Sequence, residues 1–159
     1  MGAVVSVDIQ VASTVGNVPS EAVMQSWVQE VINELSVTGE FEVSIRIVDE
    51  EEGRELNKQY RDKDQATNVL SFPAVDAAIA NLPADLPQPL GDIVICGPVA
   101  EREASAQQKT TESHWAHLLV HGTLHLLGHD HENDADAEAM EAIETRILGR
   151  RGVADPYAA

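Results

Sequence analysis

Apolar and polar residues alternate in two short stretches of the chain. In residues 4–11 the apolar positions are Val5, Val7, Ile9 and Val11, and in residues 41–47 they are Phe41, Val43, Ile45 and Ile47. A period of two places successive side chains on opposite faces of a strand, so each stretch predicts a strand with one buried face. Two shorter apolar runs, residues 67–72 and residues 91–96, predict two further strands.

Helical spacing of apolar residues appears between and after these strands. It starts after Pro19 and continues to Gly39, a polar helix is expected over residues 50–61, and Pro98 is placed to open another. Residues 110–127 predict a fourth helix, and Asn133 or Asp134 can cap a fifth. The order of elements predicts an α+β fold with a single mixed β-sheet of about four strands covered by about five helices.

The remaining segments set the domain organisation. A chain of 159 residues is long enough for one ordinary hydrophobic core, so residues 1–159 are expected to form a single domain. Residues 73–90 contain four prolines and several alanines. That composition predicts a long exposed loop.

The composition limits which cellular compartment and which binding partners are expected. The formal net charge is -17, which argues against a broad phosphate-binding surface, because phosphate binding depends on Lys and Arg. A local basic patch is still available within ten positions, either as an RNA contact or as a solvated helix face: Arg54, Lys58, Arg61 and Lys63. A single cysteine, no signal-like start and no long apolar run predict a cytoplasmic protein without a membrane partner.

The histidines are the most informative feature. All six fall within residues 114–131. In a helix, His121 and His125 stack on one face about 6 Å apart, where both imidazoles can reach one ion. Gly128 can end the helix, and the chain can then supply a third ligand from His129, Asp130 or His131. Three protein ligands with one open position are typical of catalytic zinc, whereas a cysteine-rich structural site is excluded by a single Cys.

The predicted histidine helix lies in the C-terminal half of the chain and is apolar almost all round. Four imidazoles, those of His114, His117, His121 and His125, share its one polar stripe. A helix of this kind is expected to be buried, and an unpaired buried polar group costs about 1–3 kcal/mol. A metal ion and the groups that orient its ligands would supply the missing partners.

The spacing of the ligands resembles that of zinc peptidases, but one group is missing. Those enzymes carry a glutamate general base directly after the first histidine, and here that position is Gly122. A metallopeptidase or amidohydrolase remains an alternative without its usual base. Zinc alone can lower the pKa of bound water to about 7, so a hydroxide nucleophile is available without that base. The site then needs an electrophile that a cation makes reactive, and a phosphodiester clamped by an arginine is the favoured substrate.

Four segments together resemble one known family. They are HGTLHLLGHDH preceded by AHLLV, NKQYRDKDQATNVLSF, LGDIVIC, and the C-terminal pattern of Met140, Glu144, Ile147 and Leu148. This set, from about Asn57 to Gly149, resembles the YbeY family of bacterial endoribonucleases and rRNA maturation factors. Two positions depart from the common pattern: His129 stands where a tyrosine is usual, and Asn68 where an aspartate often follows the threonine.

The resemblance implies a set of roles. His121, His125 and His131 would bind one Zn²⁺ per chain, another divalent transition metal being possible, and would act in catalysis with Arg61 in the RNA cleft. The implied function is a zinc-dependent endoribonuclease specific for single-stranded RNA, acting in rRNA maturation at the 16S 3′ end and in ribosome quality control. The implied partners are rRNA, the small ribosomal subunit and assembly proteins, with no DNA.

Other residues carry weaker expectations. Lys58 and Lys63 are candidates for substrate binding beside Arg61. His117 is either a group that orients a ligand or a hydrogen-bonded core residue, and His114 is expected to be partly exposed. A non-enzymatic ribosome-assembly factor with a structural metal is a further alternative, which metal removal would distinguish.

Overall fold

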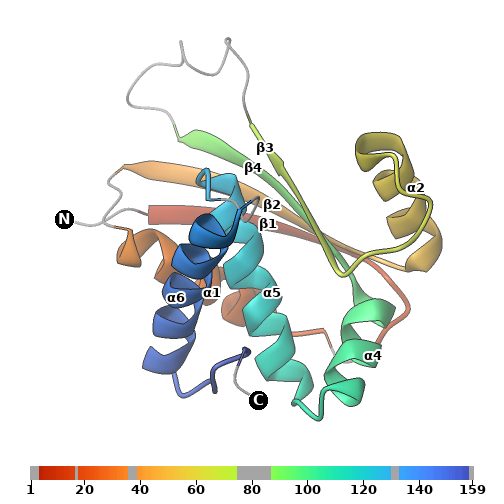
Figure 1. Cartoon of the computed structure of the whole chain (residues 1–159). Helices are drawn as coiled ribbons and strands as arrows, with labels where there is room; N and C mark the ends of the chain where they lie inside the picture. The colour runs from red at the N-terminus through yellow and green to blue at the C-terminus, as the bar shows by residue number, and fades with distance from the viewer. Residues whose placement is uncertain (1–3, 17, 36–38, 75–86, 130–132, 158–159) are drawn as a thin grey trace.

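A single mixed sheet forms the centre of the molecule (Figure 1). The computed structural model describes residues 4–16, 18–35, 39–74, 87–129 and 133–157. The strands are β1 Val4–Ala12, β2 Glu40–Val48, β3 Val69–Pro73 and β4 Gln88–Cys96. The helices within the described ranges are α1 Glu21–Glu34, α2 Glu50–Arg61, α4 Gly97–Ala106, α5 Thr111–Leu126 and α6 Asp134–Arg150. The predicted α+β class, with four strands and five helices, is confirmed.

The sheet has the order β1-β2-β4-β3. β1 pairs with β2 and β2 with β4 in parallel, while β3 runs antiparallel to β4 along one edge. Parallel neighbours need a crossover, and α1 supplies it between β1 and β2. This arrangement leaves β3 as an edge strand beside α5.

The two faces of the sheet are covered by different helices. α1, α5 and α6 pack on one face, where the alternating residues Val43, Ile45 and Ile47 are buried against them. α2 lies over part of the other face (Figure 1) and contributes Leu56 to a smaller apolar cluster with Leu70 and other residues. The predicted burial of one face holds for β2. In the edge strand β1 only Val5 is fully buried, Val7 and Ile9 are half-buried, and Val11 is exposed.

Both ends of α5 have recognisable capping signals. Thr110 accepts a hydrogen bond from the Ser113 backbone at the start. At the other end Gly128 has φ +95°, its N–H donates to the His125 carbonyl, and the His129 N–H donates to the Leu124 carbonyl, both at 3.0 Å. These paired bonds are those of a Schellman motif, so Gly128 ends the helix as predicted.

The predicted loop over residues 73–90 is wrong at both ends. Pro73 is the last residue of β3 and pairs with Gly91, and β4 already begins at Gln88, although residues 75–86 lie outside the described ranges. Proline is tolerated here because Pro73 ends an edge strand. Gly91 has φ +138°, and a Cβ on it would lie 2.2 Å from the Phe72 carbonyl oxygen, so this close approach requires glycine.

The described helices are 10 to 17 residues long. None of them is both long enough and apolar enough to span a bilayer.

Candidate metal centre

Two imidazoles of α5 converge on one point. The Nε2 atoms of His121 and His125 lie 3.1 Å apart, with ring centroids separated by 4.6 Å and ring planes at 76°. Two imidazole nitrogens bound to one tetrahedral zinc at about 2.0–2.1 Å would lie about 3.3 Å apart. The pair therefore fits two ligands of a single ion, and it follows from the one-turn spacing on α5.

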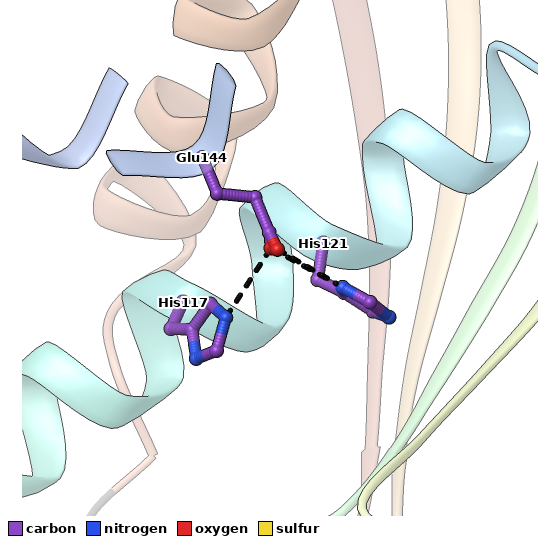
Figure 2. Close-up of side chains that lie close together, drawn as sticks. All are labelled: His117, His121 and Glu144. Carbon is purple, nitrogen blue, oxygen red and sulfur yellow. Dashed lines mark hydrogen bonds and ion pairs between the residues drawn. The ribbon is translucent and has the colours of Figure 1, made fainter. Parts of the chain in front are cut away.

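A buried carboxylate holds the other nitrogen of His121. Glu144 of α6 has a fully buried side chain, and both of its oxygens lie 3.3 Å from His121 Nδ1 (Figure 2). The same carboxylate lies 3.3 Å from His117 Nε2 and accepts a hydrogen bond from the Tyr157 hydroxyl at 2.7 Å. Metal-bound histidines commonly donate their second ring N–H to such a carboxylate.

Glu144 is ionised at neutral pH in spite of its burial. Burial by itself raises the pKa of its carboxyl. Hydrogen bonds from His117, His121 and Tyr157 together have the larger effect, and they lower the pKa below its usual value, to about 2. Burial and the neighbouring Glu144 carboxylate raise the pKa of Tyr157, so its hydroxyl remains a donor. The site thus has a fixed negative charge directly behind His121.

The described residues contain two overlapping donor sets. His117, His121 and Glu144 have ligand atoms within 4.8 Å of one another and form a group that can hold a metal ion. This set would use His121 Nδ1 and the buried carboxylate. The second set uses the Nε2 atoms of His121 and His125, and its predicted third ligand, His131, lies outside the described residues.

The two sets differ in their access to solvent. A cleft of about 520 Å³ opens between α5, β3 and the end of α2. It is lined by both histidines of the second set together with Arg61, Lys63, Ser71, His129 and eight further residues. A substrate in this cleft can approach His121 and His125, whereas the fully buried Glu144 lies on the other side of His121, where it lines a separate hollow of about 320 Å³ with Tyr157.

The predicted basic residues are distributed over two surfaces. Arg61 is the last residue of α2, Asp62 then turns the chain with φ 56°, and Arg61 and Lys63 both line the cleft. Arg61 forms no ion pair within the described part of the chain. Lys58 lies outside the cleft, in a hollow with Arg54 and several acidic residues. The structure therefore brings Arg61 and Lys63, but not Lys58, to the histidine pair.

His114 differs from the sequence expectation. It is 3% exposed, because α4 packs beside the start of α5, so the predicted partial exposure is wrong. Its Nε2 lies 2.9 Å from a Glu103 oxygen that also accepts a hydrogen bond from the Asn68 amide at 3.0 Å. Burial lowers the pKa of His114, while Glu103 opposes that change. An asparagine at position 68 can donate to Glu103, as an ionised aspartate could not.

Gly122 occupies the position where zinc peptidases have their base. An added Cβ would lie 3.1 Å from Ile93 Cγ2, so this side of α5 packs closely on β4. The Gly122 carbonyl also accepts a hydrogen bond from Ser71 of β3 at 3.1 Å. The glycine therefore serves helix-to-sheet contact.

Two residues of the network around His121 received no role from the sequence. Glu144 belonged to the C-terminal pattern but received no role, although a carboxylate within an otherwise apolar stripe of α6 is itself a signal for a buried partner. Tyr157 follows the last helix and gave no periodic signal. The packing of α6 on α5 brings Glu144 to His121, and the C-terminal segment brings Tyr157 to Glu144 and His117.

Comparisons with known proteins agree with one another. A family model described as Endoribonuclease YbeY matches residues 8–152. An Endoribonuclease YbeY from Stutzerimonas stutzeri is 53% identical, over 97% of this chain and 92% of that protein. One from Cellvibrio japonicus is 48% identical, over 95% and 82%. A solution structure of a Thermotoga maritima protein has a TM-score of 0.54 at 23% identity, covering 97% of this chain and 100% of that one, which shows a shared fold.

Proposed function

Because this chain belongs to the endoribonuclease YbeY family, we propose that it is a zinc-dependent endoribonuclease that cuts single-stranded RNA during rRNA maturation. The role extends to the 16S 3′ end and to ribosome quality control in the cytoplasm. Its partners are then rRNA, the small ribosomal subunit and assembly proteins.

The observation that carries the metal assignment is the convergence of His121 and His125 at 3.1 Å on the wall of an open cleft. We assign the metal to these two residues and His131. Glu144 then orients His121 through Nδ1 and is not itself a ligand. This assignment accounts for both nitrogens of His121 at once, and it leaves the ion accessible to substrate, as catalysis requires.

The chain's own residues bind and orient the substrate. A bound divalent ion would supply Lewis acidity at the phosphodiester. Arg61 presents a planar guanidinium that can hold two phosphate oxygens and stabilise the charge that develops on them. Lys63 adds a second positive charge to the same cleft. Lys58 remains a weaker candidate for substrate binding, on the neighbouring surface.

The peptidase alternative receives no support from the site. Gly122 has no side chain to accept a proton, and its Cβ direction is taken up by Ile93. Assays of the purified protein on an unstructured protein substrate and on RNA should show cleavage of RNA alone.

The test of the assignment is metal analysis of purified variants, coupled to cleavage assays on single-stranded and duplex RNA. His121→Ala, His125→Ala and His131→Ala should each lose stoichiometric metal and cleavage, since two ligands remain. His129→Ala and His117→Ala are matched controls that should retain the metal. Loss of metal in His117→Ala with retention in His125→Ala would move the site to the buried set of His117, His121 and Glu144.

A further inference from the structure

The segment after α6 is held against α6 and against the turn that precedes α5 by hydrogen bonds. Lys109 donates from Nζ to the Pro156 carbonyl at 3.1 Å, and Thr145 donates to Asp155 at 3.3 Å. The Tyr157 backbone N–H donates to Asp155 at 2.8 Å. The Tyr157 side chain lies at the gap between the two helices through its own contacts with His117 of α5 and Glu144 of α6.

The Tyr157 hydroxyl sits at the carboxylate behind the metal centre. It lies 2.7 and 3.0 Å from the two Glu144 oxygens and 3.0 Å from His117 Nε2. The rings of Tyr157 and His117 pack edge to face, with centroids 5.3 Å apart at 87°. The residue is 45% exposed, so its ring covers the network from outside while the hydroxyl reaches inward.

The Glu144 carboxylate has three neighbours on two segments. His117 and His121 approach it from α5, and Tyr157 approaches from the C-terminal segment. A carboxylate attached to a flexible side chain keeps one orientation only when its oxygens are held. Without the phenol, Glu144 could turn toward His117, and His121 would lose its fixed acceptor.

We propose that Tyr157 is a positioning residue of the metal centre, which fixes Glu144 and through it the His121 ring, so that Nε2 faces the cleft. This inference rests on the proposed ligand set of His121, His125 and His131. It gives the C-terminal segment a role in metal affinity, in addition to its packing on α5 and α6.

The test compares zinc dissociation constants, measured by competition with a chromophoric chelator. Tyr157→Phe removes the hydroxyl and keeps the ring, and it should weaken zinc binding roughly 3- to 10-fold, less than the 10- to 100-fold typical of losing a direct partner of a ligand. Glu144→Gln provides that larger reference. The absorption bands of the cobalt-substituted protein should also shift in Tyr157→Phe, because the orientation of the His121 ring changes.

Thr145→Val is the matched control, because it removes one hydrogen bond of the same segment and leaves the contacts of the phenol with Glu144 and His117 in place. It should bind zinc with the affinity of the unmutated protein, and both variants should retain the unmutated metal-free unfolding midpoint within a few degrees. Unchanged zinc affinity and cobalt bands in Tyr157→Phe would overturn the inference, as would an equal loss of affinity in Thr145→Val. Retention of metal by His125→Ala would instead count against the proposed ligand set.

Discussion

At the scale of single residues, Arg61 separates substrate binding from metal binding. It lines the histidine cleft and is paired with no carboxylate in the described ranges. Arg61→Ala should keep the metal and the fold but cleave RNA about 10²-fold more slowly, as for other preorganised charge stabilisers. Arg61→Lys should recover only part of the rate, because an ammonium lacks the two-pronged geometry. Single-turnover cleavage with metal analysis checks this, and an unmutated rate in Arg61→Ala would place the phosphate site elsewhere.

Gly122 gives a second prediction at this scale. Gly122→Glu restores the peptidase-like sequence, yet its Cβ would lie 3.1 Å from Ile93 and direct a carboxylate at the sheet. We expect a loss of roughly 1–3 kcal/mol in the free energy of unfolding from overpacking, and no peptide hydrolysis. Urea unfolding and a peptidase assay measure the two effects. Stability equal to that of the unmutated protein would show that β4 around Ile93 can move to accommodate the side chain.

At the scale of elements, most helices and strands follow from local signals, because periodicity and capping involve residues that are near in sequence. The helix predicted over residues 50–61 is α2, and Asn133 caps α6 through its side chain. The errors lie where pairing extends an element. β4 begins at Gln88 because those residues pair with β2, which the proline content alone does not indicate.

The start of α2 carries a prediction about pH. The Asp49 carboxylate accepts hydrogen bonds from the Ser13 hydroxyl and from Thr14, which tie the end of β1 to this helix. The Ser13 bond chiefly lowers the pKa of Asp49, against the opposing effect of desolvation. A depressed folded-state pKa gives stability that is present above the unfolded value of about 3.9 and is lost as pH falls through the folded value.

Asp49→Asn should therefore be less stable than the unmutated protein at pH 6, and the difference should shrink below about pH 4. Urea unfolding of both metal-free proteins between pH 3 and pH 7 tests this. A difference that stays constant over that range would mean that the charge of Asp49 contributes nothing.

At the scale of the whole molecule, the metal and the core are separable. α5 is buried along most of its length by apolar contacts with the sheet, α1 and α6, and these contacts do not involve the ion. Chelation should therefore abolish cleavage while the far-ultraviolet circular dichroism is retained, with a modest fall in Tm from lost ligand binding. Unfolding on chelation would instead indicate a structural metal and favour the assembly-factor alternative.

The overall charge leads to a further prediction. The formal net charge is -17, and the basic residues that line the histidine cleft are Arg61 and Lys63. RNA binding should weaken between about 50 and 200 mM salt with a shallow slope, since few phosphates are neutralised. Equilibrium binding of a single-stranded RNA over that range measures the slope. A steep slope, which corresponds to many neutralised phosphates, would reveal a basic surface that these two residues do not account for.

The local chemistry of the site is determined by the sequence itself. His121 and His125 share one face because helical geometry is the same in any helix, and Gly128 ends that helix because glycine adopts positive φ without strain. The sequence also shows directly that position 122 is a glycine and carries no peptidase base.

Only the tertiary structure decided which distant residues surround that pair. Glu144 reaches His121 because α6 packs on α5, and Tyr157 reaches Glu144 from the C-terminal segment. Arg61 shares the cleft because α2 ends beside β3. His114 is buried because α4 covers it. Such contacts join residues far apart along the chain, and they depend on how whole elements bury their apolar faces together, which spacing within one segment does not encode.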